Sequence, residues 1–281
     1  MLKAYGFIFC ATANNLSRLS LKTHSNELNE ALSDENKRGV VKIVSDIELA
    51  CRDLDLPVTV AKIMRIANRL TDKIVPLGEI KNELKHLNET LQDEVKTKLF
   101  LRIPNERALY YIEANPFGDA VATAFPSASF DIQESGKCFA CERYTATVFH
   151  LMCATEHTMR ALAWDRRVNL TTKGGASFPT MMGTWEDVLR ELEKEAVKIG
   201  NWSKSRGEVK VQALQFYNAA IEEFRAVKDA WRNPVMHARR HYTEEDAAQV
   251  MAHVKRLTTI LSTRISETER TPRVWTKAQL R

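Results

Sequence analysis

Apolar residues recur at steps of three and four from about Glu27 to Val95, which is the spacing of amphipathic helices. Two proline-containing breaks, at Leu56-Pro57 and Pro76-Leu77-Gly78, divide the pattern into three stretches. The spacing therefore predicts three helices. Their apolar positions are Val40, Val41, Ile43, Val44, Ile47 and Leu49 in the first, Val60, Ile63, Met64, Ile66, Leu70 and Ile74 in the second, and Leu77, Ile80, Leu84, Leu87, Leu91 and Val95 in the third.

The third of these stretches has the most regular pattern. Its apolar residues lie three or four positions apart, and lysine, glutamate, asparagine and histidine occupy the other faces. An apolar seam of this kind is buried against another helix, either within the chain or in a second copy. The seam is short for a free coiled coil, so packing within the chain is the preferred interpretation.

The composition changes between Ile103 and Ile132, where proline and glycine become frequent. Such residues mark turns and boundaries, so a domain division is expected here. Leu99 to Ile103 is expected to form a short strand. The predicted parts are a helical N-terminal region over residues 1–113, a linker over 114–132, a helical bundle over 133–266 and a basic C-terminal tail over 267–281.

Helical spacing returns after this break. One long helix is predicted over residues 135–165, and its apolar side chains lie on most sides, which places it at the centre of a bundle. Thr184 with Asp187, and Thr243 with Asp246, are predicted capping boxes at two later helix starts. The predicted fold is therefore all-α, with a helical bundle preceded by a helical N-terminal region. The later helices are expected over residues 184–200, 208–237 and 243–266.

The charge of the chain is unevenly distributed. Hydrophobic residues make up 44% of the chain and charged residues 27%, as in a globular protein, and the net charge is +5. From Arg225 to the C-terminus there are twelve basic and six acidic residues, so this part carries +6 and the rest −1. A basic end on a near-neutral body favours a polyanionic partner such as RNA. The alternative is a solvated basic face.

Several classes of protein are excluded by the cysteines and the apolar runs. The five cysteines are scattered along the chain and do not form a disulfide framework. Cys138-x-x-Cys141 has no second pair at the spacing of a metal site, so Cys138 and Cys141 are interpreted as core residues. No apolar run approaches the roughly 20 residues of a membrane span. Met1 to Ala13 resembles a signal peptide only weakly. A cytoplasmic protein without membrane partner, metal or cofactor is therefore expected.

Candidate chemistry is concentrated in the segment Trp231-Arg232-Asn233-Pro234-Val235-Met236-His237, at the end of a predicted helix. His237 can take a proton from a ribose 2′-hydroxyl, and Arg232 can stabilise negative charge on a phosphate. Asn233 shares a helix face with His237 and can orient it. Arg232 and His237 would lie roughly 140° apart on an unbroken helix, so Pro234 is expected to loosen this turn. The alternative is that the pair only closes a helix end.

The spacing Arg232-Asn233-x-x-x-His237 resembles the R-x(4–6)-H motif of HEPN domains, which are helical bundles that carry the motif before a turn and a final helix. The resemblance covers about residues 130–266. It implies a metal-independent endoribonuclease that acts as a homodimer with a composite RNA-cleaving cleft. It also implies an acidic residue on an earlier helix that supports the arginine, and Glu156 is the best match.

Many proteins of this family act as toxins in toxin–antitoxin pairs or in antiphage defence, so the resemblance also implies an antitoxin protein as a partner. Some of these toxins carry a tyrosine two residues after the histidine. Arg239 holds that position here, so regulation by tyrosine modification is not expected. Arg239 and Arg240 are instead candidate ligands of RNA phosphates. The competing hypothesis is a non-catalytic interaction or dimerisation module whose working surface is formed by the N-terminal helices.

Overall fold

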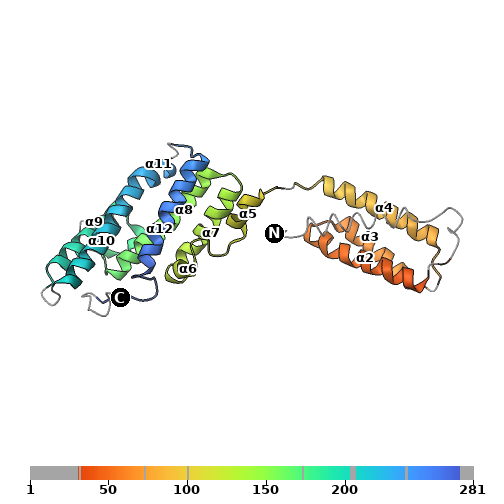
Figure 1. Ribbon diagram of the computed structural model, residues 1–281, viewed down its shortest axis with the longest axis horizontal. Helices are drawn as coiled ribbons and strands as arrows, with labels where there is room; N and C mark the ends of the chain where they lie inside the picture. The colour runs from red at the N-terminus through yellow and green to blue at the C-terminus, as the bar shows by residue number, and fades with distance from the viewer. Residues whose placement is uncertain are drawn as a thin grey trace. The chain divides into compact units, whose positions relative to one another are not determined.

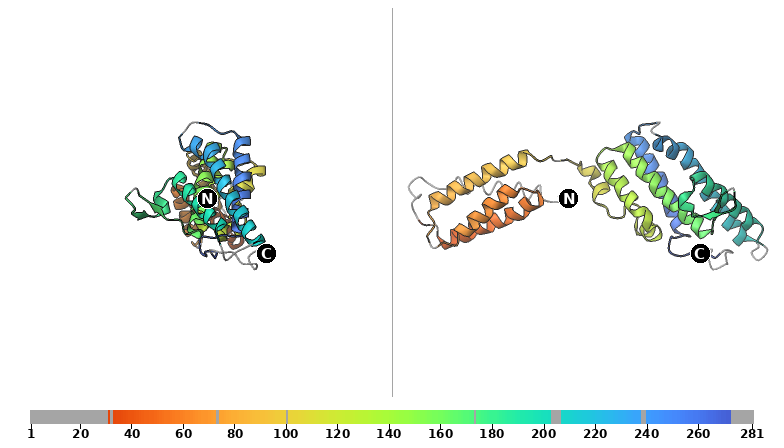
Figure 2. Two further views of the ribbon diagram at one scale, coloured as in Figure 1. Left: turned by 90° about the vertical axis from the view of Figure 1, so that its left-hand side faces the viewer. Right: turned by 180° about the vertical axis from the view of Figure 1, so that it is seen from behind.

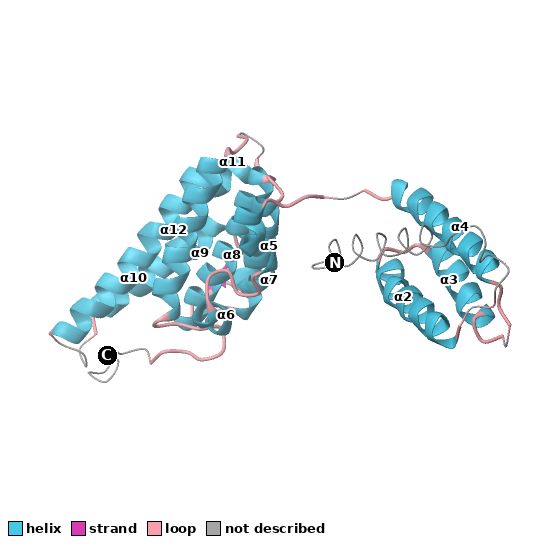
Figure 3. Cartoon of the chain, turned by 45° about the vertical axis from the view of Figure 1, so that its right-hand side comes forward, coloured by secondary structure: helices cyan, strands magenta, loops and turns pink. Residues whose placement is uncertain are grey.

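In the computed structural model, the regular secondary structure of the described residues is almost entirely helical (Figure 3). The strands among these residues are β1 (Leu170–Thr171) and β2 (Ser177–Phe178), which pair antiparallel. The prediction of an all-α fold is confirmed. The segment Met1 to Ala13 and the candidate residue Arg239 lie outside the description. The structure describes residues 31–272 except 32, 73, 100, 173, 203–206, 238 and 239.

The chain divides into two compact units, Met1–Leu101 (unit 1) and Arg102–Arg281 (unit 2), which are both seen in Figure 1. This division falls earlier than the predicted linker at 114–132. That stretch is not a linker, because α6 (Asp119–Ala124) and α7 (Pro126–Ala140) belong to unit 2 and pack against its other helices. Pro126 marks the start of α7 instead, a position that favours proline. The described residues between 99 and 103 form no strand.

Unit 1 contains three helices among its described residues, α2 (Asp34–Asp53), α3 (Pro57–Arg69) and α4 (Leu77–Lys96). Helix α3 packs against both α2 and α4. The apolar seam of α4 is buried in the core of this unit, which confirms the prediction that it packs within the chain. The buried seam residues are Ile80, Leu84, Leu87 and Leu91.

The start of α3 is capped by a residue from another helix. Helix α3 begins at Pro57 and has no cap from its own preceding side chain. The carboxylate of Glu94 on α4 instead accepts from the amides of Val58 and Thr59, at 3.0 and 2.6 Å. Burial opposes ionisation of Glu94, but these hydrogen bonds outweigh it and hold its pKa below the usual value. A tertiary contact therefore satisfies the free amides of this helix.

Unit 2 is a bundle around α8 (Tyr144–Asp165), which packs against helices that precede and follow it in the chain. Figure 2 shows α12 in blue beside α8 in green, and the β1–β2 hairpin projecting from the side of the bundle. The remaining elements are η1 (Asn105–Arg107), α5 (Ala108–Ile112), η2 (Thr180–Met182), α9 (Trp185–Gly200), α10 (Glu208–Val227), η3 (Lys228–Arg232), α11 (Asn233–Met236) and α12 (Glu244–Ser262).

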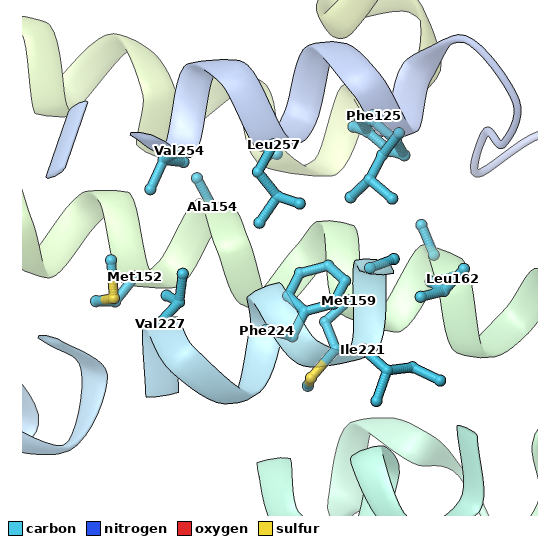
Figure 4. Packing of buried hydrophobic residues seen from close by; sticks show 14 of the residues in the cluster. Phe125, Met152, Ala154, Met159, Leu162, Ile221, Phe224, Val227, Val254 and Leu257 are labelled. Atoms are coloured by element: carbon cyan, nitrogen blue, oxygen red, sulfur yellow. The ribbon is translucent and has the colours of Figure 1, made fainter. Parts of the chain in front are cut away.

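Helix α8 is buried on most of its sides, as its sequence predicts. Figure 4 shows Val254 and Leu257 of α12 facing α8 from one side, and Ile221 and Phe224 of α10 facing it from the other. All four of these residues are buried, and so is Met159 of α8 between them. Close packing on two opposite sides leaves little room for solvent along α8. Any polar group on this helix must therefore find a partner within the protein.

The predicted helix over 135–165 is two helices. Helix α7 ends at Ala140, and α8 begins at Tyr144. Between them Glu142 adopts a left-handed conformation with a φ of 59°, and the amide of Arg143 donates to the carbonyl of Cys138 at 2.8 Å. This is a helix ending that usually uses glycine. Because no glycine or proline marks it, the turn that folds α7 back onto α8 could not be predicted from the sequence.

Two predicted helix starts are confirmed. Thr184 and Asp187 form a capping box at the start of α9, and Thr243 and Asp246 form one at the start of α12. Each threonine accepts from the amide of its aspartate, and each aspartate accepts from the amide of its threonine. Among the described residues no helix combines the length and the apolar character needed to cross a membrane.

A buried polar network ties the C-terminal segment to the bundle. Asp165, at the end of α8, is fully buried and accepts from Nε of Arg166 at 2.7 Å and from the hydroxyl of Tyr217 at 3.2 Å. Its other oxygen accepts from the amide of Thr271 at 2.7 Å. The guanidinium of Arg166 lies 4.4 Å from the centre of the Tyr217 ring. The start of the predicted basic tail is therefore part of the packed domain.

Replacing Asp165 should destabilise unit 2 strongly. Asp165→Ala leaves the buried guanidinium of Arg166 without its carboxylate, so the free energy of unfolding should fall by about 3–5 kcal/mol. Urea unfolding followed by tryptophan fluorescence measures this unit alone, because all five tryptophans lie within Arg102–Arg281. The control Asp229→Ala removes an exposed carboxylate and should cost less than about 1 kcal/mol. Equal losses in the two variants would contradict a structural role for the network.

Candidate functional site

The predicted motif begins in a π-helical turn. Element η3 spans Lys228–Arg232, and the amide of Asn233 donates to the carbonyl of Lys228, five residues earlier. Pro234 follows in the first turn of α11. In a regular α-helix the ring of Pro234 would crowd the carbonyl of Ala230, and it has no amide to donate. The wider turn relieves this conflict, and single π-turns of this kind occur often at functional sites.

The expected loosening between Arg232 and His237 is not found. Arg232 and Asn233 both have helical dihedral angles, with φ and ψ of −61° and −52°, and −63° and −46°. The amide of His237 donates to the carbonyl of Asn233 at 3.2 Å, so the helix continues to its end. The effect of Pro234 is absorbed in η3, the π-helical turn that ends at Arg232. The two side chains therefore leave the helix in directions roughly 140° apart.

Asn233 is paired with Arg232 and not with His237. Its side-chain oxygen accepts from Nη1 of Arg232 at 3.3 Å. Arg232 is half-buried, and its guanidinium lies 5.9 Å from the centre of the Trp185 ring. Its Nε atom is buried without a hydrogen-bond partner. An unsatisfied buried donor is costly, so Arg232 retains capacity to bind an acceptor.

Glu156 lies on α8 close to this arginine, but its direct partners are other residues. Its carboxylate accepts from Nε1 of Trp185 at 2.5 Å and from Nε of Arg160 at 3.2 Å. Burial opposes its ionisation, yet the hydrogen bonds from Arg160 and Trp185 and the nearby charge of Arg232 hold its pKa below the usual value. Glu156 therefore carries a stable negative charge that acts on Arg232 through space.

His237 and Arg240 are both on the surface, with different surroundings. His237 caps the end of α11 and is exposed. Arg240 is also exposed, but its guanidinium forms an ion pair with Asp246 at 2.5 Å and lies 5.1 Å from the centre of the Tyr242 ring. The charge of Arg240 is therefore partly compensated by the first turn of α12, and a phosphate would compete with Asp246 for it.

A second group of polar residues near Glu156 was missed by the sequence reasoning. Asp131 of α7 lies between two histidines of α8, with Nδ1 of His150 at 2.8 Å and Nε2 of His157 at 3.7 Å. The histidines are seven residues apart and share one helix face, which was the available signal. Asp131 was overlooked because it lies in the stretch interpreted as a linker.

Cys153 adjoins the same group but is a poor nucleophile. Burial raises the pKa of its thiol to about 11, and the charges of Asp131 and Glu156 act in the same direction. The thiol is therefore protonated at neutral pH, and only the thiolate is an effective nucleophile. Within the described part of the chain, no group of three or more His, Cys, Asp or Glu side chains is placed to hold a metal ion.

Comparison with known proteins adds no assignment. No protein-family model matches the chain, and no curated protein or solved structure gave a match. The interpretation of the site therefore rests on its own residues and their geometry.

Glu156 should stabilise unit 2 in a pH-dependent way. Glu156→Gln removes the charge that binds Arg160 and faces Arg232, so the free energy of unfolding at neutral pH should fall by about 1–2 kcal/mol. Because the pKa of Glu156 in the folded protein lies below the ordinary glutamate value, the contribution is complete above that ordinary value. It should be lost as the pH falls through the lower folded value. Urea unfolding from pH 3 to pH 8, followed by tryptophan fluorescence, measures the difference.

The matched control is Glu222→Gln, which neutralises an exposed carboxylate on α10 in the same unit. Its effect should stay below about 0.5 kcal/mol at every pH. The free energies of unfolding of Glu156→Gln and the parent should converge at the acid end of the range. If their difference stays the same there, the charge of Glu156 is not the basis of the stabilisation.

Proposed function

We propose that unit 2 is a HEPN-type endoribonuclease domain that cleaves RNA without a metal ion at Arg232, Asn233 and His237. The observation that carries the proposal is the contrast between the two motif residues. His237 is exposed at the helix end, whereas Arg232 is half-buried with an unsatisfied Nε and a fixed carboxylate nearby. RNA cleavage by internal attack requires an accessible base and a positioned cation, and this motif supplies one of each.

The proposed reaction is a transfer within the RNA chain. His237 takes the proton of a ribose 2′-hydroxyl, and the oxygen attacks the adjacent phosphorus. Arg232 stabilises the additional negative charge on the phosphate oxygens. The bond from phosphorus to the 5′-oxygen breaks, and that oxygen receives a proton from a second histidine in its imidazolium form. The products are a 2′,3′-cyclic phosphate and a 5′-hydroxyl.

The proposed enzyme acts as a homodimer. Within one chain the side chains of Arg232 and His237 leave the helix in different directions, and no hydrogen bond between them is found in the described residues. Two copies related by a two-fold axis can bring both motifs into one cleft, because the same surface then meets itself. The partner's His237 is then the second histidine that the reaction needs.

The wider role proposed for the chain follows from the same motif. We propose a cytoplasmic toxin or antiphage-defence effector that an antitoxin protein restrains. Its support is the order of elements in unit 2, in which the motif ends a late helix and a turn leads to the final helix α12. RNA is the proposed substrate, consistent with the excess of basic residues after Arg225.

A second candidate function is a non-catalytic interaction module. The described residues of unit 1 expose several large apolar side chains outside the buried cluster of its helices, and contiguous exposed apolar residues are typical of contact surfaces. The ion pair between Arg240 and Asp246 also reduces the positive charge beside the motif. The exposed large apolar residues in the described part of unit 1 are Val41, Leu49, Val58, Met64, Ile74, Leu99 and Leu101.

Cleavage of RNA should depend on both motif residues. The purified chain is incubated with total cellular RNA in the presence of EDTA, and the products are resolved by gel electrophoresis. The parent should produce fragments that end in cyclic phosphates. His237→Ala and Arg232→Ala should each reduce the rate by a factor of about 100 or more. Circular dichroism should show an unchanged helical content.

The matched control is His86→Ala, which removes an exposed histidine of α4 in unit 1 and should cut at the parental rate. If His237→Ala cuts as fast as the parent, the assignment of the site is incorrect. If the parent does not cut RNA, the interaction module becomes the favoured function.

A further inference from the structure

Unit 2 contains a large cavity whose wall includes Asp131, Glu156 and Arg160. Its volume is about 1090 Å³, and it lies between α8, the start of α7, the β2–η2 segment and the residues that follow α12. Pockets that hold small molecules usually have volumes of roughly 300–1,000 Å³, so this one is large enough for an organic ligand. Apolar and aromatic residues form part of its wall, among them Trp164 and Phe178.

Two of the three carboxylates in the cavity wall are already occupied. Asp131 is held by His150 and His157, and Glu156 by Arg160 and Trp185. Arg160 also donates to the carbonyls of Thr180 and Gly183, so its charge is engaged as well. These residues stabilise one another and leave little capacity for a ligand.

Two other residues of the wall carry buried polar atoms that lack partners. Nη1 of Arg167 and Oε1 of Glu267 are both buried without a hydrogen bond. The second oxygen of Glu267 accepts from the amide of Ser127 at 3.1 Å, at the start of α7, so this carboxylate is fixed in place. Unsatisfied buried groups are rare in folded proteins. One donor and one acceptor are therefore open beside the same cavity.

A second cation of the wall has no carboxylate partner among the described residues. The guanidinium of Arg270 lies 4.3 Å from the centre of the Trp164 ring, which places the charge on an aromatic face. Such stacking orients an arginine without neutralising it. Arg167 and Arg270 together supply two positive charges for which the described part of the chain offers no ion pair.

We propose that this cavity binds a small hydroxylated phosphomonoester, with its phosphate held by Arg167 and Arg270 and a hydroxyl donating to Glu267. A phosphomonoester carries a charge of roughly −1.5 to −2 at neutral pH, which matches the two open arginines. Arginine binds phosphate oxygens through paired hydrogen bonds. The hydroxyl satisfies the open oxygen of Glu267. The proposal is independent of RNA cleavage, although Glu156 lines this cavity as well as facing Arg232.

The backbone at Arg167 allows stability and binding to be separated. Arg167 follows α8 in a left-handed conformation with a φ of 58°, and the amide of Val168 donates to the carbonyl of Ala163 at 2.9 Å. Glycine is the residue best suited to this position. Arg167→Gly should therefore fold at least as well as the parent while losing the guanidinium. Glu142→Gly is the matched control, because Glu142 ends α7 in the same conformation and does not line the cavity.

The test is calorimetric titration of the full chain with AMP, ribose 5-phosphate and glycerol 3-phosphate. Adenosine serves as the probe without phosphate, and succinate as a dianion without phosphorus. At least one phosphomonoester should bind, inorganic phosphate should compete with it, and adenosine should not bind. Arg167→Gly and Arg270→Gln should each weaken binding roughly tenfold or more, whereas Glu142→Gly should leave the affinity unchanged.

Three results would overturn the proposal. The first is that no phosphomonoester binds, which would leave water as the partner of the open atoms. The second is that succinate or adenosine binds as tightly as the phosphomonoesters. The third is that Arg167→Gly, shown to be folded by its thermal unfolding, binds with the parental affinity. Loss of RNA cleavage does not bear on any of these results, because each one is measured by binding.

Discussion

The structure of unit 2 depends on the burial of α8. Packing of α10 and α12 against its opposite sides removes water from most of its length, so its polar residues must be satisfied by protein atoms. Asp165 is satisfied by Arg166, Tyr217 and Thr271, and Glu156 by Arg160 and Trp185. The central helix thereby determines both where the C-terminal segment is anchored and where a fixed negative charge faces the motif.

Some buried polar groups around α8 lack a hydrogen-bond partner within the described part of the protein. Arg232, Arg167 and Glu267 each keep a buried polar atom without a hydrogen bond. Arg232 lies in η3, which packs against α8, while Arg167 follows α8 and Glu267 follows α12. Unpaired buried groups lower stability, and they are tolerated where a ligand completes them. The same physical condition underlies both proposals, a phosphate-stabilising arginine in the motif and an anion site in the neighbouring cavity.

Much of the fold was predictable from local pattern. The three helices of unit 1, the starts of α9 and α12, and the central position of α8 follow from apolar spacing and from the capping residues of Thr184 and Thr243. The turn at Glu142 was not predictable, because a left-handed residue other than glycine leaves no mark in the sequence. The linker was misplaced for the related reason that proline begins a helix as readily as it ends one.

The sequence by itself determined the helical class, the helices of the described part of unit 1, the starts of α9 and α12 and the residue types available for chemistry, since these depend on local spacing and side-chain chemistry. Only the tertiary structure decided which of those residues meet. It paired Asn233 with Arg232, Arg240 with Asp246 and Asp131 with two histidines of α8. The pairing of Asp131 depends on the packing of α7 against α8, and the pairing of Asn233 follows a π-turn that absorbs Pro234, and neither is encoded in the spacing of a single helix.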